Sequence, residues 1–347
     1  MRRTIYIQAA EQISIQEPLC EKWMDEPILY DTESFVKAIN PSFKEYMAPN
    51  EVRRMSNIMK RAIVTTKKVL QETNIEHPDA IITGTSIGCL DYTEKFLDTM
   101  VANNEETMSP THFMQSTHNT VGATLGIYTK THGYNSTYSH GGVSFELSLL
   151  DAWMQLQLRE IDNALVTGHD EMVQSYYELL TKSGYVGQRG MTPCGEVAMS
   201  MLLNTKKTPD VLCEMCGVNV GCISNSDDAI KQIDRLLTDC GLSRADVGAV
   251  VTGVNGKPDN DNMYGNIADK AFPSTPLLHY KHIFGENFTS PALAVYAMAH
   301  CLKRGVVPDF MKYENRSYEG EKNIVLLINY SNEADFSVII LKKVSVA

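Results

Sequence analysis

The sequence lacks a surplus of positive charge and lacks long apolar runs. Its 347 residues carry 31 Lys and Arg against 42 Asp and Glu, which gives a formal net charge of -11. Without a basic surplus to neutralise phosphates, we expect no nucleic-acid partner and no anionic-membrane partner. No segment has the apolar length of a signal peptide or a membrane helix, so we expect a cytoplasmic protein without a membrane span.

A metal-binding or disulfide pattern is also missing from the eight cysteines. Most lie inside apolar segments, as Cys89, Cys194 and Cys301 do, which favours buried thiols in a reducing compartment. The segment CEMCGVNVGC (213–222) resembles half of a zinc site, but the second ligand pair is missing and its alternation is typical of a strand. The sequence therefore predicts no metal and no other cofactor.

Gly/Ser-rich and low-complexity tracts are absent, which argues against two domains on a flexible linker. Instead, the same order of predicted elements occurs twice. Residues 55–88 predict a helix, a polar link, a buried strand and the turn GTSIG, and residues 226–256 predict the same order ending in GVNG. A polar segment with a proline at residues 205–210 separates the repeats. We predict two halves, residues 1–207 and 208–347.

Further apolar segments are typical of strands, each at the end of a helix-to-strand connection or before a turn. They are ALVT (164–167), AMSMLLN (198–204) and NIVLLINYS (323–331), the last closing the chain with a strand and a turn. Continuous apolar strands that each follow a helix indicate parallel sheets covered by helices on both faces. The sequence thus predicts an α/β fold.

The segment NSTYSHGG (135–142) places Ser139 shortly before two glycines and a long apolar segment. A nucleophile on a strand-to-helix turn has this pattern. A serine hydroxyl needs a base in contact, and His140 is a poor candidate because adjacent side chains on a tight turn diverge. Ser139 is therefore a candidate nucleophile whose base has to come from another part of the chain.

Taken in order, several segments resemble the β-ketoacyl synthases of the thiolase-like fold. Each is weak alone, but their order and spacing are specific. The resemblance implies a five-layer αβαβα arrangement of two duplicated halves with mixed, mainly parallel sheets. The segments are RRMSNIMKRAIVTTKKVL (53–70), GTSIG (84–88), HNTVGATLGIYTKTHGYNSTYSHGG (118–142), LVTGHDE (165–171), CGEVAMSMLL (194–203) and YKHIFGENFTSPALAVYAMAHCLKRGVVP (280–308).

In that family a cysteine on the turn attacks an acyl thioester, and two histidines assist a decarboxylating condensation with a malonyl-loaded carrier. The resemblance places the cysteine position at Ser139, the first histidine position at Asn255 and the second at Glu286. The accompanying lysine is kept as Lys281. The family's Gly-Phe-Gly-Gly loop, which helps to build the oxyanion hole, aligns with NYSNEADF (329–336).

These replacements oppose the condensation. Serine lacks the accessible thiolate that a cysteine offers at a helix N-terminus. An ionised Glu286 at ~4 Å from a malonyl carboxylate repels it by roughly 4 kcal/mol at an effective dielectric of about 20. Side chains in the oxyanion loop restrict its backbone. The resemblance therefore predicts a non-condensing member of an acyltransferase family, similar to chain-length factors, the degenerate sister subunits of some synthases.

The same resemblance implies partners. These are acyl carrier protein and a second subunit, in a homodimer or in a heterodimer with an active ketosynthase, for fatty-acid or polyketide biosynthesis, including the aryl-polyene type. Two other hypotheses stay open. One is an active acyltransferase or hydrolase that uses Ser139 with Glu286 or a histidine, and the other is a structural dimerisation module without an acyl pocket.

Overall fold

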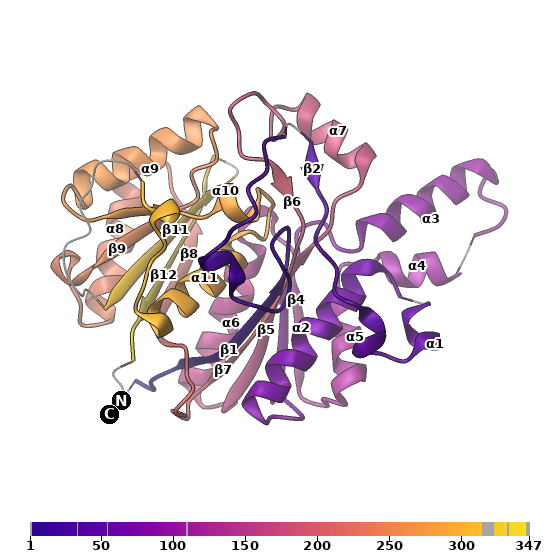
Figure 1. Cartoon of the computed structure of the whole chain (residues 1–347), viewed down its shortest axis with the longest axis horizontal. Helices are drawn as coiled ribbons and strands as arrows, with labels where there is room; N and C mark the ends of the chain where they lie inside the picture. The colour runs from indigo at the N-terminus through magenta and orange to yellow at the C-terminus, as the bar shows by residue number, and fades with distance from the viewer. Residues whose placement is uncertain are drawn as a thin grey trace.

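The computed structural model describes residues 2–32, 34–53, 55–108, 110–313, 323–331 and 333–344. Arg54 and Asn332, which belong to two of the compared segments, lie outside the described residues. Figure 1 shows two groups of strands side by side, with helices between them and on their outer faces. Among the described residues, no helix is both long enough and apolar enough to cross a membrane.

The first half is a mixed sheet in the order β4-β3-β5-β7-β1. Strand β3 runs parallel to β4 and β5, and β7 runs antiparallel to β5 and β1. One strand, β7, thus opposes the common direction of the others. The bounds are β1 (Tyr6–Ile13), β3 (Ala80–Gly84), β4 (Tyr134–Tyr138), β5 (Asn163–Asp170) and β7 (Val197–Asn204).

The second half repeats this topology in the order β8-β12-β11-β9-β10. Strand β9 is parallel to β10 and β11, and β12 is antiparallel to β11 and β8. The duplication predicted from the repeated plan is therefore confirmed. The bounds are β8 (Cys213–Cys222), β9 (Ala249–Thr252), β10 (Leu277–His279), β11 (Ile324–Ser331) and β12 (Asp335–Lys342).

Helices complete the five predicted layers. Helices α2 (Asn57–Thr73) and α5 (Thr120–Thr129) pack on the outer face of the first sheet, and α8 (Ser226–Asp239) and α9 (Pro258–Ala271) on that of the second. Between the sheets lie α6 (Ser144–Leu158), which contacts β3, β5 and β8, and α11 (Pro291–Arg304), which contacts β1, β7, β11 and β12. Residues 291–302 of α11 are all buried, as expected for a helix enclosed on every side.

The two halves meet where β1 pairs antiparallel with β8, at Tyr6 with Glu214 and Ile7 with Cys213. The predicted boundary between residues 207 and 208 falls in the link from β7 to β8 and stays a prediction. The end of the chain differs from the prediction. We expected strand 323–331 to close it with a turn, but β12 follows and pairs with β11 along its whole length.

The remaining elements are short or peripheral. Cys89, Cys194 and Cys301 are buried, as predicted. Helices α3 (Leu90–Ala102) and α4 (Pro110–Ser116) project from the body of the molecule (Figure 1). The others are α1 (Pro49–Val52), β2 (Phe35–Val36), α7 (Gln174–Lys182), β6 (Cys194–Gly195) and α10 (Lys281–Phe284).

A buried ion pair ties the outer helix α2 to the first sheet. Arg61 Nη1 lies 2.9 Å from Glu196 Oε2, and both side chains are almost fully enclosed. The carboxylate of Glu196 also accepts the backbone N–H of Ala38 at 2.9 Å and of Met172 at 3.1 Å, while Arg61 Nε donates to Asn40 Oδ1. The polar atoms of this pair are therefore well satisfied, as a buried charge requires.

We expect Glu196→Ala to lower the free energy of unfolding by about 3–5 kcal/mol, because it leaves the Arg61 charge buried and unpaired. The exposed pair Lys22–Glu17 offers a matched control, since its atoms lie at the same 2.9 Å but about half of each side chain is exposed. Glu17→Ala is expected to cost at most about 1 kcal/mol. Urea unfolding measures both, and equal losses would contradict the expectation.

Candidate active site

Three of the four predicted site residues lie together at one edge of the second sheet. Asn255 follows β9, and Lys281 begins α10 directly after β10. Because β9 and β10 are parallel neighbours, their carboxyl ends meet at the same edge, where ligands bind in open α/β sheets. Glu286 follows α10 and reaches the same place. All three side chains line a pocket of about 200 Å³.

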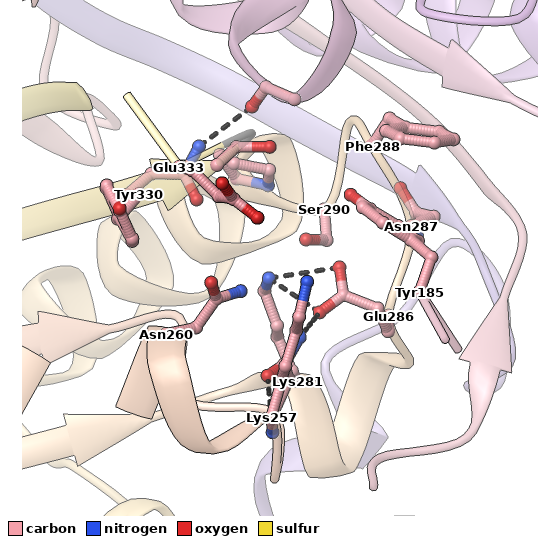
Figure 2. A pocket seen from close by; sticks show the side chains of 15 residues that line it. Tyr185, Lys257, Asn260, Lys281, Glu286, Asn287, Phe288, Ser290, Tyr330 and Glu333 are labelled. Atoms are coloured by element: carbon pink, nitrogen blue, oxygen red, sulfur yellow. Dashed lines mark hydrogen bonds and ion pairs between the residues drawn. The ribbon is translucent and has the colours of Figure 1, made fainter. Parts of the chain in front are cut away.

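Lys281, Glu286 and Asn255 form one hydrogen-bonded network. Figure 2 shows the side chains of Lys281 and Glu286 pointing toward each other. Lys281 Nζ donates to Glu286 Oε1 at 3.0 Å and to Oε2 at 2.8 Å, and Asn255 Nδ2 donates to Oε2 at 2.6 Å. Each residue is at most 5% exposed. The opposite charges of Lys281 and Glu286 compensate each other. The side-chain amide of Asn255 donates to the same carboxylate.

The backbone around Asn255 is fixed as well. Asp261 accepts the backbone N–H of Asn255 at 3.1 Å and of Gly256 at 3.0 Å, and Asn255 Oδ1 accepts the N–H of Lys257 at 3.0 Å. Gly256 has a φ of +85° and lies so close to Gly190 that a Cβ would strike its carbonyl oxygen. Only glycine fits this turn without strain. The turn therefore holds the Asn255 amide facing Glu286.

Ser139, the fourth predicted residue, lies apart from this network. It follows β4 at the end of the first sheet and is exposed, and its hydroxyl donates to the Ser86 carbonyl at 3.3 Å. Gly142 from the same turn lines the pocket, but Ser139 is not among the lining residues. Within the described part of the chain, no carboxylate or imidazole is hydrogen-bonded to the Ser139 hydroxyl. A catalytic role for Ser139 stays a prediction.

The turn at Gly142 contacts the end of β11, the part of the chain where the resemblance aligns the family's glycine-rich oxyanion loop with residues 329–336. A Cβ on Gly142 would lie 2.6 Å from the Cβ of Ser331, so the turn and the end of β11 are in direct contact. Asn329 Nδ2 donates to the Gly142 carbonyl and to Glu146 Oε1, both at 2.8 Å. Instead of an open loop, residues 329–331 are the last residues of β11.

Glu146 is a buried acid that sequence reasoning missed. It lies in the first turn of α6, is 0% exposed, and accepts hydrogen bonds at Oε1 from Asn329 and from Ser337 Oγ. Its Oε2 has no hydrogen-bond partner within the described residues. Burial raises the pKa of Glu146 to about 7. The one signal in the sequence is a single acid inside the apolar run SFELSLL.

The layers, the duplicated topology and the site at the strand ends define a protein of the thiolase-like synthase class. A family model described as "Beta-ketoacyl synthase, N-terminal domain" matches residues 23–237, more than half of the sequence. The chain belongs to the β-ketoacyl synthase family. No curated protein matches the sequence.

Solved structures agree in fold at low sequence identity. The ishigamide ketosynthase/chain length factor has a TM-score of 0.82 and 16% identity, covering 99% of this chain and 100% of that chain. A ketosynthase (ApeO) in complex with its chain length factor (ApeC) from Xenorhabdus doucetiae has a TM-score of 0.80 and 15% identity, covering 99% and 98%. A type II PKS acyl-carrier protein in complex with its ketosynthase (AntDE:AntF) has a TM-score of 0.81 and 11% identity, covering 99% and 100%. The five-layer prediction is confirmed by these likenesses.

We expect Glu286→Leu to lower the free energy of unfolding by about 3–5 kcal/mol, because Lys281 then keeps a buried charge without its partner. The double variant Lys281→Met, Glu286→Leu removes both charges and is expected to cost less than Glu286→Leu alone. Denaturant unfolding of both single variants and the double variant measures the coupling. Additive losses would show that the two side chains do not stabilise each other.

The pKa of Glu146 gives a second expectation. Because the folded-state pKa of about 7 lies above the ordinary glutamate pKa of 4.5, the stabilising contribution of Glu146 is full below pH 4.5 and is lost as the pH rises through 7. Glu146→Gln imitates the protonated acid. Relative to the wild type, we expect this variant to gain about 2–3 kcal/mol of stability between pH 4.5 and 7.5. The exposed substitution Glu160→Gln is the control, and parallel pH profiles for Glu146→Gln and the wild type would refute the assignment.

Proposed function

We propose that this chain is a non-condensing, chain-length-factor-like subunit of a cytoplasmic β-ketoacyl-synthase assembly. It contributes to fatty-acid or polyketide biosynthesis, including the aryl-polyene type, together with acyl carrier protein and a synthase-fold partner. The observation that carries this proposal is the network of Lys281, Glu286 and Asn255. It includes both positions at which the resemblance places the family's histidines.

Condensation needs donors that stabilise the negative charge developing on the thioester oxygen. An ionised Glu286 accepts hydrogen bonds and donates none, and the Asn255 amide already donates to it at 2.6 Å. The ammonium of Lys281 is held by the same carboxylate. The positions that should polarise a substrate carbonyl are thus engaged with one another.

The contact of Ser331 with Gly142 supports the same conclusion. An oxyanion hole requires backbone N–H groups that face an open position about 3 Å away. Here the side chain of Ser331 lies against the turn, and Asn329 bonds the Gly142 carbonyl. Side-chain atoms of Ser331 and Asn329 thus contact the turn at the place where the resemblance aligns the family's glycine loop.

The unpaired edge of the first sheet favours the proposal of a partner subunit. Strand β4 is the last strand in the sheet order and pairs with β3 on one side, so its other edge is free for pairing within the described structure. Exposed apolar side chains flank it, namely Ile127, Tyr134, Met154 and Leu158. Open strand edges and apolar patches are typical of surfaces that pair with another chain. The complexes named for similar structures, a ketosynthase with its chain length factor and a ketosynthase with its carrier protein, support such partners.

The purified chain is expected to release no carbon dioxide from malonyl-loaded carrier and to gain no acyl mass from acyl thioesters. Radiometric carbon dioxide release and intact-mass spectrometry measure these two outcomes, with a cysteine-bearing synthase as the positive control. We expect Ser139→Cys to stay on the order of 100-fold or more below that control in condensation, because loss of a single oxyanion donor already costs about that much.

Ser139→Ala is the matched control for the competing hypothesis. A stable acyl adduct on the wild type that disappears in Ser139→Ala would identify an acyltransferase or hydrolase. Carbon dioxide release by the chain alone would overturn the non-condensing assignment itself.

A further inference from the structure

Two cysteines come together on the outer face of the second sheet. Cys216 lies in β8, and Cys240 directly follows the last turn of α8. The Sγ atom of Cys240 lies 3.5 Å from the carbonyl oxygen of Cys216, which is hydrogen-bond distance for a thiol donor. Both side chains pack against the apolar cluster that α8 and α9 share with the second sheet, and both are partly exposed. The pair is therefore close in space and open to small reagents, and neither cysteine lines the pocket of the candidate active site.

A bulge in β8 directs Cys216 toward α8. Residues 213, 215, 218 and 220 of this strand pack in the central core between the two sheets. Regular alternation would make 217 the next inward residue after 215, so the strand carries one extra outward-facing residue at this point. The register with β12 shifts at the same place. Cys216 and Gly217 therefore both face the helix, and a Cβ on Gly217 would lie 3.0 Å from the Sγ atom of Cys240.

Arg2 fixes the backbone beside both thiols. Its Nη2 donates to the Cys216 carbonyl at 2.7 Å, and its Nη1 donates to the Asp239 carbonyl at 2.5 Å. One planar guanidinium thus joins β8 to the last turn of α8. The same group lies over the ring of Trp153, 4.9 Å from its centroid. The two cysteines are therefore held near each other by contacts that need no bond between their sulfur atoms.

The surroundings make the two thiols unequal. Burial, together with the nearby carboxylate of Glu214, raises the pKa of the Cys216 thiol to about 12. Burial also raises the pKa of Cys240, but the positive charge of Arg2 opposes that shift. Because the thiolate is the reactive form of cysteine, Cys240 is the thiol that reacts first. Both thiols are protonated at neutral pH, so the pair stays reduced until an oxidant is present.

We propose that Cys216 and Cys240 form a reversible disulfide in the presence of a disulfide oxidant such as oxidised glutathione. The Cys240 thiolate attacks one sulfur of oxidised glutathione and releases one glutathione thiolate. The Cys216 thiolate then attacks the Sγ atom of Cys240 in this mixed disulfide and releases the second glutathione. The two protein thiols lose two protons and two electrons, and oxidised glutathione is reduced to two molecules of glutathione.

The bridge ties α8 to the strand at which the two halves meet, because β8 pairs with β1 at Cys213 and Glu214. A covalent link between residues 216 and 240 removes conformational freedom from the unfolded chain. The oxidised protein is therefore expected to unfold at a higher urea concentration than the reduced protein. This inference is independent of the proposed function, since it concerns neither the pocket nor a partner subunit.

Oxidation of the native chain with oxidised glutathione at mildly alkaline pH tests the inference, with peptide mass spectrometry as the measurement. After free thiols are blocked, trypsin should release residues 208–231 joined to residues 236–244, and fragmentation should place the link between Cys216 and Cys240. We expect at least about tenfold more of this link in native protein than in protein oxidised in urea, because the fold brings these two sulfur atoms together in preference to other pairs. Dithiothreitol should remove the link.

Two serine variants of the same strand serve as matched controls. Cys216→Ser should stop at the mixed disulfide between Cys240 and glutathione and should show no rise in the urea midpoint. Cys222→Ser removes an exposed thiol of β8 and should form the bridge as the wild type does. Glutathione bound to Cys222 without any link at Cys240 would overturn the inference, because the oxidant would have reached the chain. A link from Cys240 to Cys213 or Cys222 instead of Cys216 would contradict it as well.

Discussion

The central layer of two helices constrains the rest of this structure. Helices α6 and α11 lie between the sheets, so each has to bury side chains against both of them. Two buried acids lie near the N-terminal ends of these helices. Glu146 lies in the first turn of α6, and Glu286 precedes α11 by five residues. Helix N-termini favour negative charge, which is a physical reason why the buried acids of the site gather there.

The buried charges of the site compensate each other within the fold. A buried lysine needs a compensating charge, and Glu286 provides it for Lys281 at 2.8 Å. Asn255 also donates to this carboxylate, and Asn329 bridges the carbonyl of Gly142 to Glu146. Lys281, Glu286 and Asn255 are thus bonded to one another, whereas Glu146 Oε2 has no hydrogen-bond partner within the described residues.

Strand and turn patterns reached the α/β fold and the repeated plan, because each strand is an apolar run with a characteristic turn after it. The five layers and the grouping of Asn255, Lys281 and Glu286 came from the resemblance to the synthase family. Sequence reasoning missed β12, because FSVIILKK was not separated from the strand before it. It missed Glu146, because a single acid in an apolar run does not show which distant strands supply its hydrogen-bond donors. The exposure of Ser139 depends on how distant elements pack together, and so does the projection of helices α3 and α4. A local sequence pattern does not predict such packing.

Strand β1 is the first strand of the chain, yet its partners come late. It pairs with β7 along its length, Tyr6 opposite Asn204, and then with β8 at Glu214. Contacts so distant in sequence carry a large loop-closure cost and slow folding. During synthesis, the apolar face of β1 therefore stays unpaired until more than half of the chain has been made. A protein built in this way depends on whatever shields that strand in the meantime.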